Sequence, residues 1–184
     1  MGKLYAELDR GLRAFFEAQH IFFVATAPLS AHGHVNVSPK GLDTIRILGP
    51  KAGAYLDLVG SGVETLAHLR ENGRITLPFC AFDGRPRILR LYGRGRTVEP
   101  RDAGWDRLVA NFPDYPGARS VVLVDVERIA KSCGYVVPLY RYAGDRAQLT
   151  AWADRKGAEK LERYKAEKNH QSVDGLPGLR STDR

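Results

Sequence analysis

The sequence predicts a mainly β fold with flanking helices, of the α+β class, built on an antiparallel sheet that closes into a small barrel. Six or seven short segments are rich in β-branched and aromatic residues, which is typical of strands. Most of these segments are joined by short turns, which favours antiparallel pairing. A sheet of this size around one core closes readily into a barrel.

Length and composition set the limits of this prediction. The 184 residues are 43% hydrophobic and 27% charged, as expected for one globular domain. The net charge of +7 favours an anionic partner, and two cysteines are too few for a disulfide framework. No segment has the length of a membrane span and no signal core is visible, so we expect a cytoplasmic protein without a membrane partner.

The first elements are expected in the following order. Leucines and phenylalanines recur at helical spacing over 3–19, which predicts an amphipathic helix. A buried strand is expected at 21–27, and the alternating segment 34–39 is its returning hairpin partner. A short strand at 45–48 and a longer one at 54–60 follow.

A helix is predicted directly after this last strand. Ser61 and Glu64 have the spacing of a capping box, in which each side chain accepts a hydrogen bond from the other residue's backbone. Asn72 and Gly73 predict a left-handed helix end. The apolar segment 74–82 is then expected to be a strand.

The second half of the chain continues with strands and two helices. We expect a strand at 87–99, a helix near 101–112, a strand at 120–134 and a shorter strand at 136–143. A highly charged helix is expected at about 150–168, followed by a turn-rich tail.

The segment from Gly60 to Thr65 is a first candidate binding site. Free N–H groups and small residues at a helix start can hold a phosphate, although the segment has neither the Walker nor the dinucleotide-binding spacing. The alternative is an ordinary helix start without a ligand.

A second candidate is a dense group of arginines on the strand predicted at 87–99 and the turn before it. Such a group suits a phosphate or carboxylate ligand, and the alternative is a solvated strand face or ion pairs at a dimer contact. Its members are Arg85, Arg87, Arg90, Arg94 and Arg96.

The histidines do not predict a metal site. His32 and His34 could chelate an ion, but two ligands in a turn do not complete a site. His68 is expected to be a packing or surface residue, with haem ligation as the alternative.

The order of elements resembles the pyridoxamine 5′-phosphate oxidase-like family of FMN-binding split β-barrels. The resemblance is carried by HVNVSPKG at 34–41, by the strand, turn, helix and strand at 54–82, and by RPRILRLYGRGRTVE at 85–99. It implies a six-stranded antiparallel split barrel at about 15–145, with the C-terminal helix and tail at about 150–184. It also implies a homodimer with FMN at the subunit interface and flavin redox chemistry.

The resemblance also implies which residues contact FMN. One strand would run along the flavin ring, a second would line its other side, the helix start would lie at the phosphate, and a strand from the partner subunit would reach the ring. In that order the residues are Val35, Asn36, Val37, Ser38 and Lys40, then Leu58 and Val59, then Glu64 and Thr65, and finally Arg87 and Ile88.

Glu64 and Thr65 depart from the family pattern, which has an Arg-Lys pair on the phosphate at this place. Two like charges about 4 Å apart repel by about 4 kcal/mol at an effective dielectric constant of roughly 20. Either Glu64 caps its own helix while Thr65 and backbone amides hold the phosphate, or Lys40, Arg46 and the arginine group supply the missing charge.

We therefore expect an FMN-dependent oxidoreductase of unknown substrate, with a small molecule as substrate or electron donor. No side chain is identified as a required acid or base, so catalytic residues stay unassigned. The alternative is a non-catalytic flavin- or haem-binding protein. Nucleic-acid binding through the arginine group is a third hypothesis; it would require steep salt dependence, and we expect no nucleic-acid partner.

Overall fold

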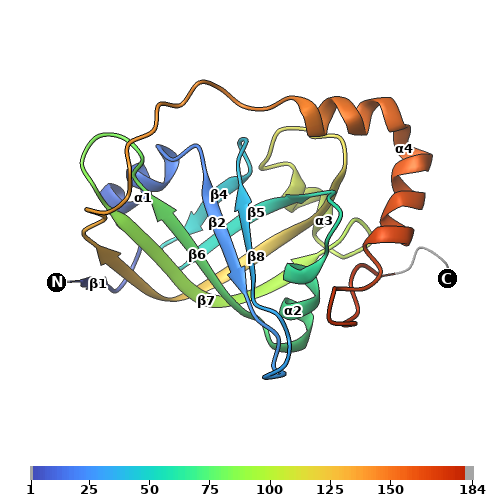
Figure 1. Cartoon of the computed structure of the whole chain (residues 1–184), viewed down its shortest axis with the longest axis horizontal. Helices are drawn as coiled ribbons and strands as arrows, with labels where there is room; N and C mark the ends of the chain where they lie inside the picture. The colour runs from blue at the N-terminus through green and yellow to red at the C-terminus, as the bar shows by residue number, and fades with distance from the viewer. Residues whose placement is uncertain (1, 181–184) are drawn as a thin grey trace.

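A computed structural model describes residues 2–180 and is centred on one antiparallel sheet of eight strands (Figure 1). The strands are β1 Lys3–Tyr5, β2 Phe22–Thr26, β3 Asn36–Lys40, β4 Ile45–Gly49, β5 Ala52–Leu58, β6 Arg74–Cys80, β7 Ile88–Val98 and β8 Ala118–Ser132. The helices are α1 Arg10–Glu17, α2 Glu64–Asn72, α3 Trp105–Val109 and α4 Gln148–Lys168.

The sheet curls until its two ends face each other. Its strand order is β3-β2-β6-β7-β8-β5-β4, with β1 paired to β8. The rings of Phe22 in β2 and Tyr55 in β5 meet across the core, with centroids 5.8 Å apart. Lys40 at the end of β3 donates a hydrogen bond to Asp57 in β5. Side chains thus connect the ends where backbone pairing stops, so the sheet is strongly curved but not closed.

The hydrophobic core lies inside this curved sheet. Alternate residues of β7 point inward, and Leu89 and Leu91 are fully buried. Helix α1 covers one end of the core, where Phe16 packs edge-on against Phe79 with ring centroids 4.5 Å apart. Helix α2 packs closely against β7, because a side chain at Gly95 would lie 2.8 Å from a methyl group of Leu69.

The antiparallel α+β prediction is confirmed, with eight strands in place of six, but the expected closure of the sheet into a barrel is wrong because no backbone pairing joins β3 to β4. The helix predicted over 3–19 begins later than expected. Residues 3–5 instead form β1 on β8, and helix α1 starts after Asp9, whose carboxylate accepts a hydrogen bond from the Leu12 N–H at 2.8 Å. The N-terminal cap therefore sets the start of this helix more strongly than the apolar spacing does.

The strand predicted at 136–143 does not form. Residues 133–147 run as an extended segment over the molecule from the end of β8 to α4 (Figure 1). Pro138 has no N–H for a ladder, and the segment has one backbone hydrogen bond to the sheet region, from Tyr140 to the Phe82 carbonyl at 2.8 Å. Val136 and Leu139 are 93% and 77% exposed.

The C-terminal region consists of α4 and a tail that folds back onto the sheet side of the molecule. Gly157 interrupts the helical conformation with φ of 73°, so α4 is kinked there. The tail that follows contains one isolated bridge between Gln171 and Pro177. Residues 181–184 of the expected tail lie outside the described residues. No helix within 2–180 is long and apolar enough to cross a membrane.

Candidate functional site

The main pocket lies between β3 and β5 and has a volume of about 870 Å³. Strands β3 and β5 form its walls, the loop 60–62 and the start of α2 lie at one end, and residues 142–149 lie at its rim. Apolar side chains line much of it. They include Leu42, Leu56, Leu58, Val59 and Leu149.

Six of the eleven residues predicted to contact FMN line this pocket. They are Ser38, Lys40, Leu58, Val59, Glu64 and Thr65. Asn36 lies next to this group, since its side-chain amide donates hydrogen bonds to the Ser38 hydroxyl at 3.2 Å and to the Thr65 hydroxyl at 3.1 Å.

The other four predicted residues lie elsewhere in this chain. Val35 and Val37 are 72% and 59% exposed. The guanidinium of Arg87 lies 5.0 Å from the ring centroid of Phe15, and Ile88 pairs with Cys80 and Ser132 in the sheet. None of the four lines the main pocket.

A buried cluster of three charged groups lies at the wall of the main pocket. The Asp57 carboxylate accepts hydrogen bonds from Lys40 Nζ at 2.8 Å and from Arg119 Nε at 2.6 Å. The Asp57 side chain is 0% exposed and that of Arg119 is 5% exposed. Burial alone would raise the pKa of Asp57, but the positive charges of Arg119 and Lys40 hold it below its usual value. Asp57 is therefore ionised, and the cluster carries a net charge of about +1.

Sequence reasoning missed Asp57 and Arg119. Each is a single charged residue within an apolar strand segment, without a motif around it. The one available signal was the charge itself, because a buried acid or base is rarely found without a partner.

Helix α2 begins at Glu64, and the predicted capping box is wrong. Val63 occupies the N-cap position and no side chain caps the helix. The left-handed end at Gly73 is confirmed, with φ of 69°. Because Ser61 makes no cap, the first N–H groups of α2 keep their capacity to bind an anion.

The tail holds the loop 60–62 and the side chain of Glu64. Asn169, which is 0% exposed, donates its amide to the Gly60 carbonyl at 2.9 Å. The Val173 N–H donates to Glu64 Oε1 at 3.4 Å. Asp174 accepts hydrogen bonds from the backbone N–H and the ring of His34, at 2.7 and 2.6 Å. The tail therefore connects the loop to the hairpin between β2 and β3.

Residues 142–149 border the main pocket from the side of the extended segment. The ring of Tyr142 stacks on His20 with centroids 3.6 Å apart and planes 4° apart. Tyr142, Asp145 and Arg146 all line the pocket. This segment and the tail, both beyond the sheet, thus help to shape it.

The other candidate cations do not reach the main pocket. Arg46 forms an ion pair with Asp43 at 2.5 Å and also donates to the Asn111 carbonyl. The arginine group on β7 lies apart from it, and Arg94 pairs with Glu127 at 3.4 Å on the exposed face of the sheet. None of these arginines lines the main pocket of its own chain.

His68 is a buried packing residue, as one of the two sequence interpretations expected. His68 is 0% exposed, and its Nδ1 lies 3.0 Å from the Thr26 hydroxyl. Burial lowers the pKa of His68. It does not line the main pocket, and the described residues contain no group of three or more His, Cys, Asp or Glu side chains that could hold a metal ion.

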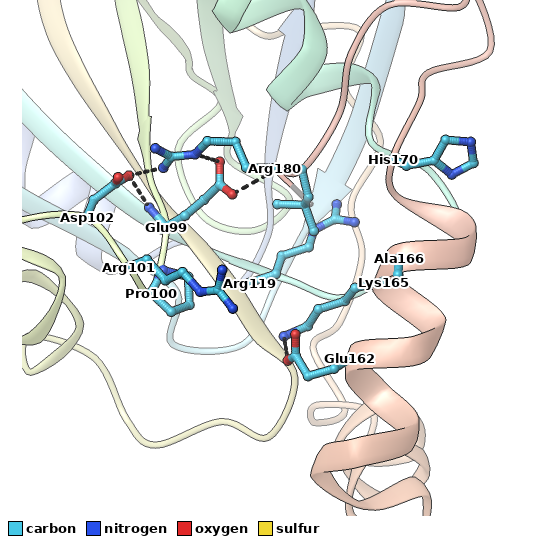
Figure 2. A pocket seen from close by; sticks show the side chains of 11 residues that line it. Glu99, Pro100, Arg101, Asp102, Arg119, Glu162, Lys165, Ala166, His170 and Arg180 are labelled. Atoms are coloured by element: carbon cyan, nitrogen blue, oxygen red, sulfur yellow. Dashed lines mark hydrogen bonds and ion pairs between the residues drawn. The ribbon is translucent and has the colours of Figure 1, made fainter. Parts of the chain in front are cut away.

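A second cavity, the tail pocket, has a volume of about 620 Å³ and lies between α4, the tail and the ends of β7 and β8. In Figure 2, Arg180 of the tail lies beside Glu99 and Asp102, while Lys165 of α4 contacts Glu162. Arg119 lines both cavities, so it lies between them.

Comparison with known proteins identifies a family model and a curated relative. A family model described as pyridoxamine 5′-phosphate oxidase matches residues 8–133. The pyridoxamine 5′-phosphate oxidase family protein ustO of Aspergillus flavus is 39% identical over 198 residues, covering 98% of this chain and 79% of that protein.

Two solved structures share the fold. HupZ of Group A Streptococcus aligns with a TM-score of 0.52 and 21% identity, covering 66% of this chain and 90% of that one. A Lactobacillus delbrueckii protein described as a pyridoxamine 5′-phosphate oxidase aligns with a TM-score of 0.52 and 18% identity. The alignment covers 69% of this chain and 98% of that one. At these identities the structures support the fold alone.

Proposed function

Because the chain belongs to the pyridoxamine 5′-phosphate oxidase family, we propose that it is an FMN-binding oxidoreductase that works as a homodimer. The observation that carries this proposal is the main pocket, which brings six of the residues predicted from sequence to one cavity. Its volume of about 870 Å³ lies within the usual range for cofactor sites.

The groups in the main pocket fit a flat ring with an anionic tail. Leu56, Leu58 and Val59 offer an apolar wall for the ring. Ser38, Ser61 and Thr65 offer hydroxyl groups at the same cavity. The charged cluster supplies a net positive charge beside the loop 60–62, where the anionic end would bind.

FMN, when bound, would supply the transfer of hydride or electrons between a donor and an acceptor. The protein's own side chains would bind and orient it. Lys40 is fixed by Asp57, so its charge stays at one position. Asn36 fixes the Thr65 hydroxyl in the same way, through a hydrogen bond, and residues of the segment 142–149 would border the bound ring.

The homodimer proposal is supported by exposed apolar side chains on β3 and on the extended segment 133–147. Val37, Leu139 and Tyr140 are 59%, 77% and 65% exposed, so these apolar side chains are available for contact with a second copy. Arg87 and Ile88 lie away from their own chain's main pocket, which agrees with a role toward the pocket of a second copy.

The test of this function begins with an absorbance spectrum of protein purified without added cofactor. We expect flavin bands, a dimer in light scattering, and bleaching when a reduced nicotinamide donor is added without oxygen. Flavin bands that no donor bleaches would instead support a non-catalytic flavin protein, and a Soret band would support haem. A colourless monomer that does not take up added FMN would contradict the proposal.

A further inference from the structure

The start of α2 lacks the two cations that the family resemblance implies at the flavin phosphate. Glu64 and Thr65 occupy these positions. The Glu64 carboxylate also lies close to the loop, since a side chain at Gly62 would come within 2.3 Å of Glu64 Oε2. A phosphate at this end of the main pocket therefore needs positive charge from another part of the chain.

Arg119 is placed to supply that charge. Its Nε donates to Asp57 at 2.6 Å, and its Nη1 donates to the Gly62 carbonyl at 2.9 Å. These two bonds hold the guanidinium directly at the loop 60–62. Among residues 2–180, its remaining nitrogen, Nη2, has no hydrogen-bond partner. The Arg119 side chain is 5% exposed and lines two cavities, and a guanidinium with an unused donor nitrogen is a strong binding group for an oxyanion.

The electrostatic balance around Arg119 also favours an anion. Asp57 neutralises one of the two cations that it contacts, Lys40 and Arg119. The excess positive charge lies largely away from water, where its interaction with an anion is stronger than at the surface. This excess charge would attract a phosphate in the main pocket and offset the repulsion from the Glu64 carboxylate, which lines the same pocket.

The backbone of the loop completes the donor set. The N–H groups of Gly60, Ser61 and Gly62 make no hydrogen bond to any group among residues 2–180. A side chain at Gly60 would meet no atom within 4 Å, so the space beside this residue is open. The first turn of α2, a helix of nine residues, adds further free N–H groups.

The tail pocket is less suited than the main pocket to hold an anion bound by Arg119. Its other cations include Lys165, which pairs with Glu162 at 2.8 Å, and Arg180, which pairs with Glu99 and Asp102. Lys40 and the loop donors are found on the main-pocket side.

We propose that Arg119, together with the loop 60–62, binds the phosphate monoester of the flavin in place of the missing cation pair. This inference rests on the proposed function, because it assumes that a flavin occupies the main pocket. It assigns to Arg119 a direct contact with the phosphate and predicts that the chain prefers FMN to riboflavin, the same ring without the phosphate.

The test compares the dissociation constants of FMN and riboflavin, measured by fluorescence titration of flavin-free protein. In Arg119→Gln we expect the preference for FMN over riboflavin to fall about tenfold or more, since charge-assisted hydrogen bonds to phosphate are lost. Riboflavin affinity should stay within about twofold of wild type. Arg96→Gln removes the same charge from an exposed position of β7 and is the matched control; it should leave both constants unchanged.

A second variant controls for loss of folding, because Arg119→Gln leaves the buried Asp57 carboxylate with Lys40 as its one cationic partner. Asp57→Asn combined with Arg119→Gln removes both buried charges and should show the same loss of preference for FMN. An unchanged preference for FMN in both variants would overturn the inference while leaving the proposed function intact. Failure of wild-type protein to bind either flavin would overturn the proposed function itself.

Discussion

The arginines of β7 and the single Arg119 at the start of β8 show how differently the same side chain is used in two regions. Arg94 is 57% exposed and has a 3.4 Å ion pair with Glu127, which is 60% exposed. Arg119 is 5% exposed and bonds Asp57 at 2.6 Å. Water can replace the partner of the first arginine but not that of the second. A run of closely spaced charged residues in the sequence therefore indicates a binding site less well than a single charged residue that the fold buries.

Removing Asp57 should produce the largest difference between the two regions. Asp57→Ala leaves Arg119 and Lys40 without their buried counter-charge, and we expect a loss of about 3–5 kcal/mol in the free energy of unfolding. Denaturant unfolding measures this loss. Asp125→Ala, at an exposed position of β8, is the control and should lose far less. A loss of less than about 1 kcal/mol in Asp57→Ala would show that the buried cluster contributes little.

Low pH should also reduce the stability that the buried cluster around Asp57 provides. The pKa of Asp57 is lowered in the folded protein, so the unfolded chain takes up the proton more readily as pH falls. The contribution of Asp57 is complete above its unfolded pKa of about 3.9, and it is lost as pH falls from there through the folded value. Unfolding curves at several pH values should show this loss in wild type and not in Asp57→Asn. Parallel curves would contradict it.

Lys40 should affect ligand binding more than stability, because it is the more exposed cation of the cluster. Lys40→Ala should weaken FMN binding by about 1.5–3 kcal/mol, or roughly tenfold to more than a hundredfold. Lys51→Ala, at the exposed turn before β5, is the matched control. Fluorescence titration gives both constants, and unchanged affinity in Lys40→Ala would remove this residue from the site.

Glu64 should have a smaller effect of opposite sign. Glu64→Lys replaces a repelling charge near the phosphate end with an attracting one, so FMN affinity should stay equal or become tighter. The lost bond from Val173 is 3.4 Å long and exposed, so stability should change little. A large loss of FMN affinity in the same titration would mean that the carboxylate has a positive role in binding.

The smallest effect is expected on the exposed face of β7. Arg94→Ala should change the free energy of unfolding by less than about 1 kcal/mol, because its ion pair with Glu127 and its hydrogen bond to the Asn72 carbonyl are both exposed. FMN affinity should not change. A loss as large as that of Asp57→Ala would abolish the distinction between the two regions.

Local pattern in the sequence was enough to predict most of the fold. Period-two alternation and turn residues located β2, β3 and β5 to β8, because each pattern is a property of neighbouring residues. The segment at 136–143 was predicted as a strand from its apolar residues, but no strand edge pairs with it. The end of helix α2 at Gly73 was predictable because the left-handed backbone conformation that ends it favours glycine.

The site was predictable only where a motif marked it. Ser38, Lys40 and Thr65 were found through family resemblance and do line one cavity. Arg119 and Asp57 were not, because their pairing joins residues 62 positions apart and depends on which strands become neighbours. Asn169, 109 positions from Gly60, was hidden for the same reason.

The docking of the tail has a consequence for the order of events during synthesis. A ribosome makes residues 169–180 after every strand of the sheet, yet Asn169 and Asp174 hold the loop 60–62 and the β2–β3 hairpin. A growing polypeptide can thus have its sheet in place while the cavity still lacks one of its supports. Cofactor loading should accordingly follow translation of this segment and not accompany the emergence of the strands.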